Sequence, residues 1–145
     1  MATWNAGDRI TADKLTRYAG EPEIREINSG SYTAETLLDT ITVPVVDGRR
    51  YKIVWDSEIV SSVNATSETD RVRIREDTTT GTVLQTRTIA LPNAVAAPAR
   101  AEARFTATVT EDKTFVVTGS QLGGTGSHIS GGNASAPTSL AVEND

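Results

Sequence analysis

The chain has 145 residues, a formal net charge of −5 and no cysteine. Its length allows one domain with a core of its own, and the lack of cysteine excludes disulfides, thiolate metal sites and cysteine nucleophiles. The acidic balance argues against a general nucleic-acid binder, which needs a net basic face. No stretch approaches the roughly 20 apolar residues of a membrane span. Only 5% of the residues are aromatic, so the core is thin, and oligomerisation is a common way to add buried area.

The first segment, residues 1–23, predicts one short helix from about Ala12 to Ala19. Thr11 suits the N-cap, because its hydroxyl can accept a free backbone N–H. Gly20 suits a left-handed helix stop, and Pro22 prevents continuation. A two-turn helix is marginal alone in water, so we expect it to dock on its own domain or on a partner. No secretory signal is visible, because a basic segment followed by an apolar one is missing.

The second segment, residues 24–145, predicts an all-β domain. In Arg71–Arg75, Val72 and Ile74 face one side and three arginines the other, with the period of two that marks a strand. Residues 101–110 alternate in the same way. Further strands are expected at residues 37–45, 51–55, 83–91 and 114–118. Strands with one solvent-exposed face and short polar turns imply antiparallel pairing. About seven or eight such strands indicate a β-sandwich or jelly roll.

Turn residues separate these strands. Asp47-Gly48 is a strong hairpin signal, and residues 76–81 and 111–113 are typical of polar turns. The glycine-rich stretch that starts near Gln121 is either a flexible linker or a set of tight turns before a final strand at Ser139–Glu143. We favour the final strand, because its apolar residues would return the chain to the sheet.

Few residues could carry catalysis. The only histidine, His128, lies in the glycine-rich segment without an orienting partner nearby in the sequence, so we expect a loop or turn residue. A carboxylate pair could act instead, but the candidates fall at predicted strand ends and turns, where acidic residues are expected for solvation. These candidates are Asp56, Glu58, Glu68, Asp70, Glu76 and Asp77. No EF-hand or phosphate-loop spacing is present. We therefore expect no enzymatic activity, no metal and no cofactor.

The arginine face of one predicted strand is a candidate contact surface. Arg71, Arg73 and Arg75 project from one side, and Arg87 is expected on the neighbouring strand. Such a stripe could bind an anionic surface or an acidic protein. Cross-strand pairing with Glu or Asp is the favoured interpretation, and contact with another protein is the main alternative.

The residues Trp4–Leu15 read Trp-Asn-Ala-Gly-Asp-Arg-Ile-Thr-Ala-Asp-Lys-Leu. This opening resembles the start of small virion proteins of tailed bacteriophages that infect actinobacteria, and the stretches Thr110–Phe115 and Pro137–Glu143 are also similar to that group. The resemblance implies a structural protein on the outside of a phage particle. Small all-β proteins of this length also resemble capsid decoration proteins, which are often trimers. The lack of a repetitive shaft favours capsid decoration over a minor tail or fibre-like protein.

The resemblance also implies how the protein is attached. The N-terminal segment would be the anchor, with Trp4, Ile10, Leu15 and Tyr18 as its contact residues. Expected partners are further copies of the chain, with a trimer favoured, and the major capsid protein or tail proteins. Neither a membrane nor a specific nucleic acid is expected, and the protein would reach the virion exterior after synthesis in the host cytoplasm.

A carbohydrate-binding module for a host surface glycan is the alternative from another functional class. A jelly roll suits that role, and such modules need no enzyme chemistry. The hypothesis requires exposed Trp or Tyr on one sheet face, and Trp55 and Tyr32 are the residues that would test it. Trp55, like Tyr51, has the parity of a core residue.

Overall fold

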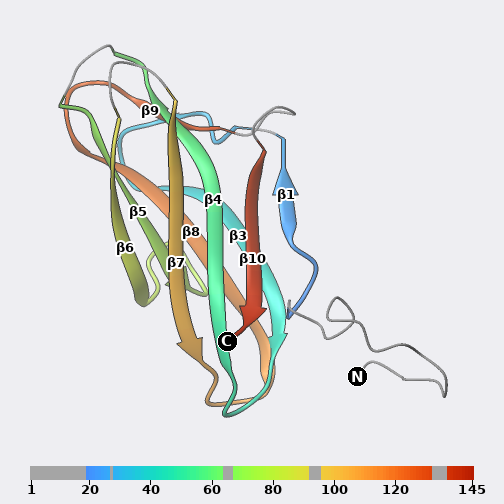
Figure 1. The fold of residues 1–145 in the computed structure, drawn as a ribbon. Coiled ribbons are helices and arrows are strands. Elements are labelled where there is room, and N and C mark those ends of the chain that lie inside the picture. Colours follow the sequence, from blue (N-terminus) through green and yellow to red (C-terminus); the bar gives the residue numbers. More distant parts are fainter. Residues whose placement is uncertain (1–18, 27, 64–66, 92–95, 132–136) are drawn as a thin grey trace.

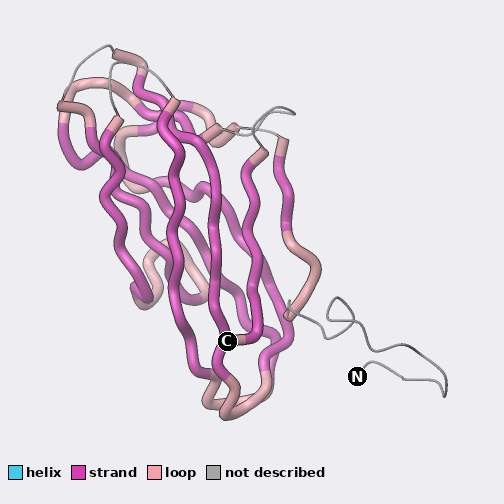
Figure 2. Tube along the Cα trace, viewed as in Figure 1, coloured by secondary structure: helices cyan, strands magenta, loops and turns pink. Residues whose placement is uncertain are grey.

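The computed structural model describes residues 19–26, 28–63, 67–91, 96–131 and 137–145. These residues form two antiparallel sheets packed face to face, so the predicted all-β sandwich is confirmed (Figure 1). Figure 2 shows strands and loops but no helix in this part of the chain. Among these residues there is accordingly no helix that could cross a membrane.

The strands are divided six to four between the sheets. The first sheet contains β1 (Glu23–Arg25), β2 (Ser31–Tyr32), β4 (Arg50–Ser61), β7 (Ala97–Thr106), β9 (His128–Ser130) and β10 (Thr138–Asn144). The second sheet contains β3 (Thr36–Val45), β5 (Thr69–Glu76), β6 (Val83–Ala90) and β8 (Glu111–Gly123). The strand order is β1-β10-β4-β9-β2 in the first sheet, with β7 also paired to β4, and β3-β8-β5-β6 in the second.

The strand pairs are nested within one another along the chain. The β5–β6 hairpin is innermost, and it is enclosed in turn by the pairs β4–β7, β3–β8 and β1–β10. Successive pairs of this series alternate between the two sheets. This is the arrangement of a jelly roll, in which a long folded-over hairpin wraps around the core. It brings the two ends of the described chain together, with Ile24 opposite Ser139.

The core lies between the sheets. It is built from alternate residues of each strand, whose side chains point inward. Trp55, Phe115 and Leu140 are fully buried there. Val72 and Ile74 are also buried, which confirms the alternation predicted for Arg71–Arg75. On β7 the buried inward positions are alanines, namely Ala97, Ala99, Ala101 and Ala103, and the half-buried Phe105 continues the same face.

The strand predicted over residues 101–110 ends earlier than its alternating pattern suggests. β7 stops at Thr106, and the N–H of Ala107 donates to the carbonyl of Arg49 where the chain crosses to the other sheet. Val109, which continues the apolar parity, is 51% exposed. The prediction of a turn at residues 111–113 is wrong, because Glu111 already begins β8.

The Asp47-Gly48 turn is present, but it does not join two neighbouring strands. Gly48 has a positive φ of 76°, and the N–H of Arg49 donates to the carbonyl of Val46. The turn connects β3 and β4, which lie in different sheets. The expected hairpin pairing is therefore wrong. Each of the two strands has one apolar face, and folding them across the core buries both faces.

Only the last residue of the predicted N-terminal helix, Ala19, is among the described residues, and it is not helical. Residues 12–18 of this helix lie outside the described residues, and Ala19 lies in a bend with its N–H donating to the carbonyl of Val142. Gly20 has no positive φ, so it is not a left-handed helix stop. A Cβ there would approach Val43 Cγ1 to 2.9 Å, so close packing explains this glycine. The domain boundary between residues 23 and 24 stays a prediction, whereas the predicted final strand is confirmed as β10.

Candidate functional site

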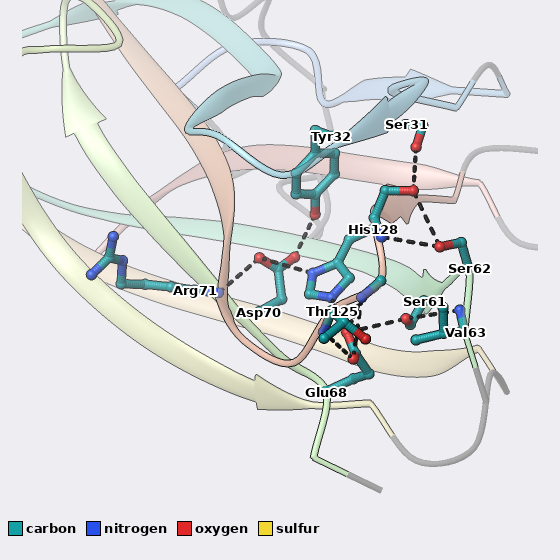
Figure 3. A network of polar contacts seen from close by, with 12 residues as sticks. Ser31, Tyr32, Ser61, Ser62, Val63, Glu68, Asp70, Arg71, Thr125 and His128 are labelled. Atoms are coloured by element: carbon teal, nitrogen blue, oxygen red, sulfur yellow. Dashed lines mark hydrogen bonds and ion pairs between the residues drawn. The ribbon is translucent and has the colours of Figure 1, made fainter. Parts of the chain in front are cut away.

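A buried network of ionisable side chains lies at one end of the sandwich. Its centre is His128, with Glu68 on one side and Asp70 on the other (Figure 3). His128 Nε2 lies 3.1 Å from Glu68 Oε2, and His128 Nδ1 lies 3.7 Å from Asp70 Oδ1. The exposed fraction is 0% for His128 and Asp70 and 1% for Glu68. The three ionisable side chains at the centre of this network are therefore removed from solvent.

The strand register places three side chains of this network at one level of the first sheet. β9 lies between β2 and β4, and His128 stands opposite both Tyr32 and Ser61. Residues directly opposite on neighbouring antiparallel strands point to the same face, here the interior. The rings of Tyr32 and His128 meet edge to face, with centroids 6.1 Å apart. Asp70 lies at the start of β5 in the other sheet, and Glu68 directly precedes that strand, so the network joins the two sheets.

Glu68 accepts hydrogen bonds from a tight turn in the glycine-rich segment. Its carboxylate accepts from the N–H of Thr125 at 2.7 Å and of Gly126 at 3.2 Å. These backbone donors, the Thr125 N–H first, together with His128 lower the pKa of Glu68 despite the opposing effect of burial. Gly124 has a φ of 96°, and a Cβ there would lie 2.1 Å from Glu68 Oε1. The turn therefore needs glycine at this position to approach the carboxylate.

Asp70 is held differently from Glu68. It accepts from the phenol of Tyr32 and from the N–H of Arg71 at 2.7 Å. Burial raises the pKa of Asp70, although both hydrogen bonds and the nearby imidazole act in the opposite direction. Burial and the neighbouring Asp70 also raise the pKa of the Tyr32 phenol. Asp70 and Glu68 are thus shifted in opposite directions, so Asp70 is the carboxyl of the pair that takes up a proton more readily.

The expectation that His128 is a loop or turn residue is wrong, because it begins β9 and is fully buried. Its association with Glu68 and Asp70 was also missed from the sequence. One signal was present: Asp70 on β5, and Glu68 just before it, share the parity of Val72 and Ile74, the core positions of that strand. Acidic residues at core parity need partners, and the only histidine is one of the few side chains able to supply one.

The remaining acidic candidates lie apart from this network. Asp56 forms an exposed ion pair with Arg100 at 2.8 Å, and Asp77 is paired with Lys113 at 2.9 Å. Both pairs are exposed. Asp77 lies in a turn as predicted, whereas the prediction of a strand end or turn is wrong for Asp56, which lies within β4. Among the described residues, no group of three or more His, Asp or Glu side chains has the arrangement of a metal site.

Two of the three predicted contact arginines are already paired within the chain. Arg73 Nη1 lies 2.9 Å from Glu35 Oε2, and Arg75 Nη2 lies 2.6 Å from Glu35 Oε1. Thr118 of the intervening strand β8 also donates to Glu35. Burial acts to raise the pKa of Glu35, but the hydrogen bonds from Arg75, Thr118 and Arg73 outweigh it and lower the pKa to about 2. Pairing with an acidic residue was the favoured interpretation, but Glu35 precedes β3 and does not lie on a strand adjacent to β5 as expected.

Arg71 is half-buried, and its Nε has no hydrogen-bond partner among the described residues. Contact of Arg71, Arg73 and Arg75 with an anionic partner stays a prediction.

The predicted anchor residues Trp4, Ile10, Leu15 and Tyr18 lie outside the described residues. The aromatic residues named for sugar binding are not on the surface, since Trp55 is 0% and Tyr32 5% exposed. Their rings cannot stack on a glycan in this structure.

Comparison with solved structures shows the fold. The chain is similar to part of dimeric latent PorU from Porphyromonas gingivalis, with a TM-score of 0.51 and 10% sequence identity, over 97% of this chain and 14% of PorU. A CBM4 structure matches with a TM-score of 0.41 and 14% identity, over 88% of this chain and 92% of that one. A structure of the infectious bursal disease virus Gx strain matches with a TM-score of 0.40 and 19% identity, over 86% of this chain and 32% of that one.

The chain thus spans about one-seventh of PorU. The other two similarities are too low to support an argument about fold or function. No protein-family model and no curated protein matches the sequence.

Proposed function

We propose that this chain is a non-enzymatic structural protein of a bacteriophage virion, and that it decorates the outer surface of the capsid. The observation that carries the proposal is the placement of its only histidine. His128, Glu68 and Asp70 are buried between the sheets and bind one another. The groups best suited to acid–base chemistry cannot contact an external substrate there, and they hold the two sheets together instead.

The N-terminal segment is the proposed attachment element. Its support is the resemblance of Trp4–Leu15 to the openings of small phage virion proteins. The described residues from Ala19 onward already contain both sheets and one continuous core. A body of this kind can stand on a particle surface while Trp4, Ile10, Leu15 and Tyr18 contact the major capsid protein. Ala19 is bound to Val142 of β10, so the segment joins the body at the β10 side of the first sheet.

Imaging of intact particles with and without this protein tests the proposal. We expect density on the capsid surface that disappears when the protein is absent. Density lost from the tail would instead support a minor tail or fibre-like protein, the second role to which the resemblance extends. Particles that lack no density, together with a protein that never co-sediments with them, would exclude a virion role altogether.

The anchor is tested by a second experiment on the same particles. A variant with Trp4, Ile10, Leu15 and Tyr18 all changed to alanine should lose capsid binding while keeping the β-sheet circular dichroism of the wild type. Leu122→Ala is the matched control, because Leu122 is an apolar side chain that is 48% exposed on the body. Binding that survives the fourfold change but not Leu122→Ala would place the contact on the sandwich.

The partners follow from the same proposal. Copies of the chain would lie close together on the particle, so a homo-oligomer is proposed, and the resemblance favours a trimer. The protein would be made in the host cytoplasm and end on the virion exterior. Contact with a glycan is not proposed, because the aromatic rings named for it are buried.

A further inference from the structure

The outer strands of the two sheets differ in how their free edges are protected. β1 and β2 have only three and two residues. β3 contains Pro44 and an irregular register between Leu37 and Asp39, and β7 contains Pro98. Short strands, prolines and irregular registers are the usual means of preventing a free edge from pairing with another chain.

The free edge of β6 has none of these features along most of its length. β6 contains neither proline nor lysine, and its register with β5 is continuous from Gln85 to Ala90. Six of its eight residues are exposed. Figure 1 shows β6 at the left margin of the molecule, where β5 is its only neighbour within the sheet. This is the exposed, regular strand edge that favours addition of a further strand.

Two polar groups on β6 are not bound to any other strand. The N–H of Thr86 donates to the side chain of the adjacent Gln85 at 2.9 Å, on the exposed side of the strand. An N–H used in this way is directed away from β5, toward the free edge. Arg87 forms no hydrogen bond or ion pair with any residue that the structure describes. It lines a groove with Arg100 and Arg104, whose guanidinium groups are already bound to Asp56, Glu102 and Asp145.

We propose that β6 pairs antiparallel with β6 of a second copy of this chain, in a two-fold contact centred on Thr86. In this register Thr86 faces its own symmetry mate, and Gln85 faces the partner's Arg87. The Thr86 N–H exchanges its side-chain bond for a backbone carbonyl. Gln85 Oε1 is then free to accept from the guanidinium of the partner's Arg87. A register centred on Arg87 would instead place two guanidinium groups opposite each other, which is unfavourable.

Pairing of one strand edge is a small contact. About six backbone hydrogen bonds would form, and the buried area falls below the roughly 1,200 Å² of a stable interface. We therefore expect a weak dimer, with a dissociation constant on the order of 10–100 μM. A two-fold contact closes as a dimer, so it differs from the trimer that the resemblance favours. It is measured on the purified protein, whereas the proposed virion role is tested on particles, so either can fail alone.

Sedimentation of the full chain between about 10 μM and about 1 mM is the first test. The wild type should shift from monomer to dimer, and Thr86→Lys should remain monomeric because the two lysines would face each other. Thr42→Lys is the matched control, because Thr42 is an exposed threonine on the edge strand β3, and it should dimerise like the wild type. A wild type that does not form a dimer, or a dimer that Thr86→Lys leaves unchanged, would overturn the proposal.

Disulfide trapping tests the register and does not depend on affinity. The chain has no cysteine, so a single introduced cysteine can react only with a second copy. Thr86→Cys should crosslink readily, because directly opposite positions have the Cα separation that a disulfide needs. Thr88→Cys is the control: its symmetry mate would lie about 13 Å away, so crosslinking should be at least about tenfold slower. Equal rates for the two variants would rule out this register.

Discussion

His128 on β9 and Glu68 beside β5 bind each other across the sandwich, with 3.1 Å between Nε2 and Oε2 and almost no exposure of either side chain. His128 lies in the first sheet and Glu68 directly precedes a strand of the second, so their contact ties the two sheets together at this end of the molecule. It also holds the turn that contains Gly124, because the same carboxylate accepts the backbone N–H groups of that turn.

The charge on Glu68 should hold this turn in place. Glu68→Gln keeps the size of the side chain but weakens the acceptor for Thr125, Gly126 and His128. We expect a lower melting temperature and faster hydrogen exchange of the Thr125 and Gly126 amides, measured by NMR. Glu21→Gln is the control, since it removes the same charge from an exposed residue. Unchanged exchange at both amides would show that the carboxylate is not needed there.

Gly124 should be sensitive to any side chain. Gly124→Ala adds a Cβ 2.1 Å from Glu68 Oε1 at a φ of 96°, so both the backbone and the carboxylate must move. We expect a loss of about 2–4 kcal/mol in the free energy of unfolding. Gly30→Ala is the matched comparison: its φ is 73° with no atom within 4 Å of the added Cβ, so only backbone strain of about 1–2 kcal/mol applies. Urea denaturation separates the two, and equal losses would contradict the proposed contact.

Glu35 should stabilise the protein at neutral pH but not in acid. Its pKa falls from 4.5 in the ordinary carboxyl to about 2 in the folded chain. The stabilisation is therefore fully present above pH 4.5 and is lost as the pH falls toward 2. With 31% of the side chain exposed, Glu35→Gln should cost about 1 kcal/mol at pH 7. The difference from the wild type should shrink between pH 4.5 and pH 2 in urea titrations, and a constant difference would count against the ion pairs.

Asp70 should show the opposite pH dependence. Its folded pKa lies above the ordinary value of 3.8, so its contribution is greatest below pH 3.8 and is lost as the pH rises through the folded value. Asp70→Asn should therefore be relatively more stable at pH 7 than at pH 4, when each is compared with the wild type. Denaturation at both pH values checks this. A larger loss at pH 7 than at pH 4 would mean that Asp70 is held as a charged group in the fold.

Local patterns in the sequence predicted the strands well, because a sheet face buried on one side imposes a period of two. The parity of Val72 and Ile74, and of Tyr51 and Trp55, identified core positions correctly. The parity at the start of β3 was misleading. A register shift between Leu37 and Asp39 leaves Leu37 46% exposed, whereas Asp39 keeps the buried parity of Ile41 and pairs with Arg25 at 2.7 Å. A shift of one residue reverses the faces of a strand, and only its partners reveal it.

The candidate site could not be found in the same way, because its members are distant in sequence. Glu68 and His128 are 60 residues apart, and Tyr32 and Asp70 are 38 apart. Their contact depends on which strand lies beside which, and neither propensity nor turn chemistry specifies that. Asp47-Gly48 illustrates the point: the local chain reversal was predicted, but the strands it joins lie in different sheets.

The nesting of strand pairs also determines when the fold can be completed during synthesis. β5 and β6 are close in sequence and can pair early, whereas β1 must wait for β10, its only partner in the sheet. β10 ends at Asn144 and lies between β1 and β4. The first sheet can therefore be completed only after the residues of β10 have been synthesised. Deletion of residues 138–144 should leave an open, aggregation-prone sheet, because an unpaired strand edge invites association.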